Sequence, residues 1–120
     1  MTQQFSFPPA ATKVADNAKL CTYQLYLAEH GASLIAVAGF VGGHEYERFT
    51  SRLICEVRNA WRWSSAFSSR FEKLHRLLSL EYADIVDHPS WVCAAEFDPQ
   101  DPRVDEVCHH VEKLADLAAA

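Results

Sequence analysis

The stretch SLIAVAGFV, residues 33–41, decides the fold, because it is apolar, carries no charge and lies between glycines. Its short length and its Ile, Val and Phe content favour a buried strand over a helix. The glycine inside it would cost a helix roughly 1 kcal/mol. His30-Gly31 precedes it and could adopt the positive φ angles of a two-residue turn. We therefore expect a β-hairpin over residues 20–41.

Pairing across that turn supports the hairpin, because it places large residues opposite small ones on one apolar face. The expected pairs are Cys21 with Phe40, Tyr23 with Ala38, Leu25 with Ala36 and Leu27 with Leu34. Such cross-strand pairs are the unit of sheet stability. The alternative is a helix over residues 12–29 that Gly31 would end. Its apolar stripe would be Val14, Ala18, Cys21, Leu25 and Ala28, so an all-α fold stays open.

Helical patterns cover most of the remaining chain. Apolar spacing predicts a helix over residues 45–63, and the capping-box pattern from Ser69 to Glu72 predicts a second helix over residues 69–86. Residues 91–97 favour a short strand. Asp101 as N-cap with Pro102 behind it predicts a last helix that runs to about residue 117. The order ββααβα gives one α+β domain over residues 12–120, preceded by a flexible arm over residues 1–11.

Composition narrows the class of protein. The chain has 120 residues, 49% of them hydrophobic, and a formal net charge of -5, which disfavours a nucleic-acid surface. The apolar run of residues 33–41 is too short to span a bilayer, and the N-terminus has no signal-peptide pattern. We expect a cytoplasmic protein without membrane contact. The four widely spaced cysteines then read as small buried residues rather than disulfides.

No sequence motif carries recognisable catalysis or metal binding. The pairs Glu72/His75 and Glu106/His109 both fit ExxH, but on their helices they cannot both face one core. His44 lacks the second histidine of a zincin motif. We find no nucleophile elbow and no phosphate loop. The sequence therefore predicts a protein that is not an enzyme and holds no metal or cofactor.

Aromatic residues near arginines favour an interaction protein instead. The helical spacing places Trp61 in the core and Trp63 nearer the surface, and the alternative is that both rings pack in the core at a helix junction. Phe5 and Phe7 lie in the arm, where they could pack on the domain itself or contact a partner. The arm, the corner after the apolar run and the tryptophan pair make up the expected partner surface: Phe5, Phe7, Phe40, His44, Glu45, Arg48, Trp61 and Trp63.

The second hypothesis is a small-molecule-binding domain or a small enzyme with a pocket. A pocket between the sheet and the helices could use Tyr23, His44, Glu45 and Arg48 as its polar groups. A ligand-dependent rise in melting temperature would favour this hypothesis over an interaction surface.

Three segments, FSFPP at residues 5–9, GFVGGHE at 39–45 and WRW at 61–63, give the chain a resemblance to a known family. It resembles the QslA-like bacterial anti-activators of quorum sensing. The resemblance implies a homodimer that binds a LuxR-type transcription factor, covers the dimer interface of that factor's ligand-binding domain and so blocks DNA binding. It assigns no contact residue, because none of the three segments is a specific motif.

Overall fold

A computed structural model describes the backbone of residues 10–82 and 98–119. These residues form three helices: α1 (Ala10–Arg58), α2 (Ser65–Leu78) and α4 (Arg103–Ala119). No strand occurs in these two ranges. The predicted strand at residues 91–97 and nearly all of the predicted arm lie outside them. The α+β prediction is therefore wrong, and the fold is all-α.

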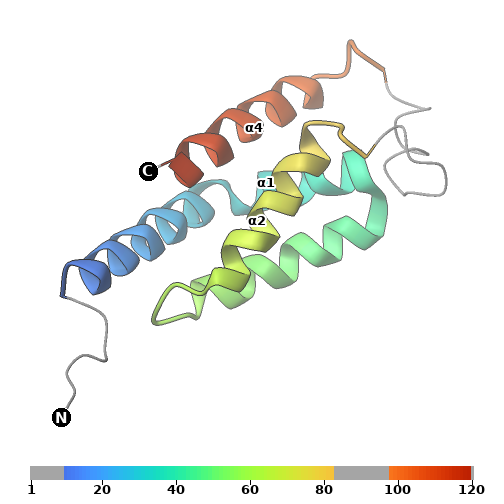
Figure 1. The fold of residues 1–120 in the computed structure, drawn as a ribbon. Helices are drawn as coiled ribbons and strands as arrows, with labels where there is room; N and C mark the ends of the chain where they lie inside the picture. The colour runs from blue at the N-terminus through green and yellow to red at the C-terminus, as the bar shows by residue number, and fades with distance from the viewer. Residues whose placement is uncertain (1–9, 83–97, 120) are drawn as a thin grey trace.

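Helix α1 consists of two limbs joined at Gly43, the one residue in it with non-helical angles (φ 77, ψ -172). We call residues 10–42 the first limb and residues 44–58 the second. A Cβ on Gly42 would lie 2.7 Å from the Tyr46 ring, so the corner also needs glycine there. The second limb returns along the first, where the Gln24 amide donates to the carbonyls of Val57 and Ala60 (Figure 1).

The predicted hairpin over residues 20–41 is one continuous helix, and His30-Gly31 does not turn the chain. Burial explains why. Pairing in strands would have buried Cys21 and Leu25, yet both are exposed. The buried side chains instead recur every three or four residues, the helical period: Leu20, Tyr23, Leu27, Leu34, Val37, Ala38 and Val41. The helical alternative was therefore right in type, although its stripe lies on the exposed side.

Helix α2 begins four residues before the predicted start at Ser69. Ser64 has extended angles, and its hydroxyl accepts from the Ala66 amide at 3.2 Å, which makes Ser64 the N-cap. The helix ends at Leu78 rather than near residue 86. It ends in a Schellman motif, because the Glu81 amide donates to the Arg76 carbonyl and the Leu80 amide to the Leu77 carbonyl. Leu80 holds the left-handed position, with φ 64.

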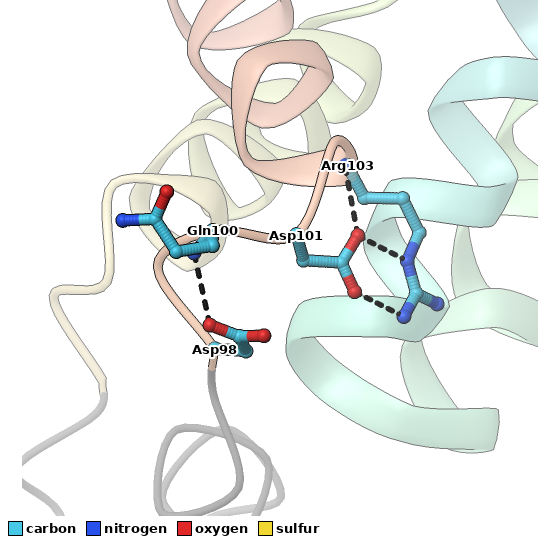
Figure 2. Close-up of polar contacts among 4 residues, drawn as sticks. All are labelled: Asp98, Gln100, Asp101 and Arg103. Atoms are coloured by element: carbon cyan, nitrogen blue, oxygen red, sulfur yellow. Dashed lines mark hydrogen bonds and ion pairs between the residues drawn. The ribbon is translucent and has the colours of Figure 1, made fainter.

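The start of α4 confirms the sequence prediction. Asp101 accepts a hydrogen bond from the Arg103 amide at 2.9 Å and pairs with the Arg103 guanidinium at 2.7 Å (Figure 2). These bonds to Arg103 lower the pKa of the Asp101 carboxyl to about 2. The Asp98 carboxylate accepts from the Gln100 amide and shapes the turn before the cap. The Arg103 guanidinium also lies 4.1 Å from the Phe40 ring centre, which ties this end of α4 to α1.

An aromatic cluster joins the first limb of α1 to α2. Tyr23 lies against Trp63 and Phe71, with ring centres 4.6 and 4.5 Å away, and Phe67 packs edge-on to Trp63 at 5.5 Å. The Trp63 indole donates to the Ser68 hydroxyl at 2.9 Å. Trp63 is thus packed and Trp61 is 80% exposed, the reverse of the predicted placement.

Residues 17–58 of α1 are long and apolar enough to cross a membrane by length and composition, a property that core helices of soluble proteins share. The bend at Gly43 divides this stretch into two antiparallel limbs. Its buried side chains belong to the same core as those of α2 and α4. We therefore describe α1 as the central helix of a compact bundle.

Candidate functional site

A chain of polar groups crosses the interface between α1 and α4. The Tyr26 hydroxyl bonds to Nδ1 of His110, and Nε2 of His110 lies 2.9 Å from the Ser33 hydroxyl. The Ser33 hydroxyl donates in turn to the Glu106 carboxylate at 3.0 Å. His110 is 1% exposed and Tyr26 is 8% exposed, so the middle of the chain is buried. This polar chain links groups that are 73 to 84 positions apart in the sequence.

The hydrogens of the polar chain can be assigned. A carboxylate only accepts, so the single proton of Ser33 goes to Glu106. Nε2 of His110 must then carry a proton and donate it to Ser33, and its Nδ1 must accept from Tyr26. The result is one neutral tautomer of His110 with both ring nitrogens satisfied. A second proton on His110 would take away the acceptor that Tyr26 needs.

Electrostatics favours the same neutral state. Burial, followed by the nearby His109 and His30, lowers the pKa of His110 to about 4. Burial also raises the pKa of the Tyr26 hydroxyl. Both groups therefore stay uncharged at neutral pH, as a buried network requires.

The pair Ser33 and His110 resembles a nucleophile with its base, but its hydrogen bonds run the wrong way. A general base must accept the serine proton, whereas His110 donates to Ser33 and the serine proton points to Glu106. Ser33 also lies inside a regular helix, whose backbone amides bond within the helix and cannot form an oxyanion hole. The arrangement is suited to holding α4 against α1.

Three histidine rings gather around the same point. The ring centres of His30 and His109, and of His109 and His110, are 5.7 Å apart, and those of His30 and His110 are 6.4 Å apart. Within residues 17–82 and 98–119 no three ligating groups converge on one metal position. His110 already uses both nitrogens in the polar chain. The cluster is therefore an electrostatic feature of the interface.

A second candidate site is the surface of the first limb that faces away from the bundle. Its centre is Leu25, which is 67% exposed. We call this surface the outer face and define it by six exposed, uncharged residues at helical spacing: Ala18, Cys21, Leu25, Ala28, Ala32 and Ala36. The first limb thus has apolar residues on two sides, although only one side packs in its own bundle.

Hollows flank the outer face. Towards α4, Thr22, Glu29 and Lys113 line one of about 350 Å³. Towards the second limb, Ile35, Cys55 and Arg58 line another of about 400 Å³. The outer face is therefore a ridge of small side chains between two grooves.

The structure separates the residues predicted to form the partner surface. His44, Glu45 and Arg48 are exposed at the corner, where Phe40 is half-buried against Arg103. Trp61 and Trp63 lie past the other end of the second limb, about 22 Å away at 1.5 Å per helical residue. Phe5 and Phe7 lie outside the described residues.

The hypothesised pocket does not form from its predicted groups. Tyr23 is buried under Trp63, whereas His44, Glu45 and Arg48 are at the corner. The described residues also provide no sheet to line it.

Sequence reasoning missed both features described above. The outer face had a signal, because four of its six residues belong to the stripe of the helical alternative: Ala18, Cys21, Leu25 and Ala28. The polar chain had no local signal, since its halves come from distant segments.

No protein-family model matches the chain, and no solved structure gives a significant match.

Proposed function

We propose that this chain is a small non-catalytic regulatory protein that binds a protein partner through the outer face of α1. One observation carries the proposal: Leu25 is 67% exposed at the centre of an uncharged helical face. Burying one leucine side chain contributes a free energy of about 1.5–3 kcal/mol. A monomer with an exposed Leu25 lacks this contribution, and a complex that covers Leu25 gains it.

The shape of the outer face suits a helix from another chain. Alanines let two helix backbones approach closely, and a single large residue such as Leu25 can insert between side chains of the partner. The grooves on both sides offer room for the partner's flanking side chains. Trp61, 80% exposed with the Arg62 guanidinium 5.0 Å from its ring centre, adds an aromatic contact beyond the end of the second limb.

The resemblance to the QslA-like anti-activators supports a partner class. In this proposal the partner is a LuxR-type transcription factor in the cytoplasm, and the chain covers the surface through which that factor dimerises. A second copy of the chain covers the same outer face in the free protein, which gives a homodimer. Binding then needs no catalytic residue, only an apolar surface that competes with existing dimers.

The experiment compares three tagged forms of the full chain in affinity capture from host lysate, followed by mass spectrometry. These are the natural sequence, Leu25→Asp on the outer face and the control Ser69→Asp on the exposed side of α2. We expect one DNA-binding regulator to co-elute with the natural chain and with the control, and to be lost with Leu25→Asp.

A gel-shift assay with the captured regulator completes the test. Added natural chain should release the regulator from its DNA, and Leu25→Asp should not. Retention of the regulator by Leu25→Asp would reject the outer face as the binding surface, and an eluate without a regulator would reject the partner class.

A further inference from the structure

A hollow opens where the first limb of α1, α2 and the end of α4 meet. Its volume is about 250 Å³. Ala115 and Ala118 of α4 face Phe71 and His75 of α2 across it, and their small side chains leave the space open. Drug-sized sites occupy roughly 300–1,000 Å³, so this hollow fits a smaller molecule.

The floor of the hollow is apolar and fixed. Phe71 and Leu114 line it and are 3% and 2% exposed, so they belong to the core. Tyr23 lies beside them in the aromatic cluster, with its ring 4.5 Å from that of Phe71. A ligand with an aromatic or aliphatic body would find a preformed surface there.

The polar groups at its edge have unused hydrogen-bond donors. The Ser68 hydroxyl accepts from the Trp63 indole, and its own proton bonds to none of the described groups. The Tyr23 hydroxyl likewise has no hydrogen-bond partner among residues 17–82 and 98–119. Both residues line the hollow, so each hydroxyl can donate to a molecule bound there.

Lys19 adds a positive charge at the edge of the hollow. Its ammonium group lies 5.3 Å from the Trp63 ring centre and pairs with no carboxylate in the described part of the chain. Lys19 is half-buried and lines the hollow, so its ammonium group is available to a molecule bound there. Glu72 also lines the hollow, and its carboxylate pairs with the Arg76 guanidinium at 3.3 Å.

We propose that this hollow is a binding site for a small organic carboxylate with an aromatic or short aliphatic body. The body packs on Phe71 and Leu114, and the carboxylate accepts from Lys19 and from the hydroxyls of Ser68 and Tyr23. This site lies apart from the outer face and is independent of the proposed partner binding. A bound acid contacts all three helices and therefore stabilises their packing.

The test is a titration of the isotope-labelled full chain, followed by NMR, with phenylacetate and octanoate as probes. Phenylacetamide, the uncharged analogue of phenylacetate, is the matched control ligand. We expect saturable shifts in the amides of residues 68–75 and 114–118, and at least roughly tenfold weaker binding of the amide, because it lacks the charge-assisted hydrogen bonds.

Two variants test the geometry. Lys19→Met keeps the aliphatic stem and should remove the preference for phenylacetate over the amide, whereas the control Lys113→Met, on another side of α4, should keep it. Ala115→Leu should fill the hollow and abolish binding without lowering the thermal midpoint, since Ala115 is exposed.

Three results would overturn the proposal. They are the absence of saturable shifts with both acids at millimolar concentration, equal affinity for phenylacetate and its amide, and undiminished preference in Lys19→Met.

Discussion

Helix α1 holds its two neighbours by different means. Against α2 it uses aromatic rings, with Tyr23 packed on Trp63 and Phe71. Against α4 it uses the polar chain, in which Tyr26 and Ser33 bond to the buried ring of His110. The aromatic contact gains from area removed from water, whereas the polar chain is stable only while every donor has its acceptor.

Because of this difference, we expect truncation of a side chain to weaken one interface and acid to weaken the other. The aromatic contact is made by Tyr, Trp and Phe rings, none of which changes charge between pH 4 and 7, so truncation of a ring is what weakens it. The polar interface depends on the neutral tautomer of His110, so acid weakens it without any change of sequence.

Truncating the aromatic interface should give the largest effect. Phe71 is 3% exposed, and Phe71→Ala should lower the free energy of unfolding by about 3–5 kcal/mol through lost burial and a cavity. The control Trp61→Ala, at an 80% exposed ring, should change it by less than about 0.5 kcal/mol. Urea unfolding followed by circular dichroism measures both, and similar losses in the two variants would refute the assigned core.

The second-largest effect should come from acid, which weakens the polar interface. Unfolded His110 has a pKa near 6.5, and in the fold it is about 4, so the unfolded state binds more protons between these values. The neutral His110 ring therefore contributes fully to the free energy of unfolding above pH 6.5. This contribution is lost as the pH falls towards 4, and the loss is on the order of 3 kcal/mol. Urea midpoints from pH 7 to 4 measure the loss.

The variant His110→Leu separates this residue from other titrating groups. It should be less stable at pH 7, because it leaves Tyr26 and Ser33 without their partner, but its stability should fall less between pH 7 and 4. An equally steep fall in the variant would assign the acid sensitivity to other groups.

Leu80→Gly should stabilise the end of α2 and leave both interfaces unchanged. Leu80 is exposed at 39% and holds a left-handed conformation, which costs a residue with a side chain about 1–2 kcal/mol. Glycine removes that cost but loses more backbone entropy on folding. We therefore expect the free energy of unfolding to rise by about 1 kcal/mol. A lower thermal midpoint would mean that the leucine side chain contributes more than its exposure indicates.

Leu25→Asp should have the smallest effect on folding, because its side chain is 67% exposed. We expect a change below about 0.5 kcal/mol in the monomer, measured by dilute urea unfolding. A loss comparable with that of Phe71→Ala would return Leu25 to the core and remove the basis for the outer face.

The parts of the fold that depend on neighbouring residues could be predicted from the sequence. Asp101 and Pro102 mark the start of α4 because a cap acts within one turn. The run at residues 33–41 was ambiguous, since a continuous apolar stretch has no period of its own. The residues before this run indicate a helix, because Leu20, Tyr23 and Leu27 are buried at helical spacing.

The sites were harder to predict, because they depend on contacts between distant segments. The sequence around Ser33 does not predict its hydrogen bonds to Glu106 and His110, because those residues are 73 and 77 positions away. Trp61 and Trp63 were placed by extending a helix that ends at Arg58. Once the helix ends there, the turn exposes Trp61 and brings Trp63 onto Tyr23.

The most direct test of the contrast between the two interfaces is amide hydrogen exchange of the full chain at pH 7 and pH 5, analysed as protection factors for each helix. We expect protection in α4 to fall by on the order of tenfold or more at pH 5, since most of the loss linked to His110 has by then occurred. Protection in α2 should change much less. Equal losses in α2 and α4, or full protection of α4 at pH 5, would contradict the claim that His110 holds α4 in place.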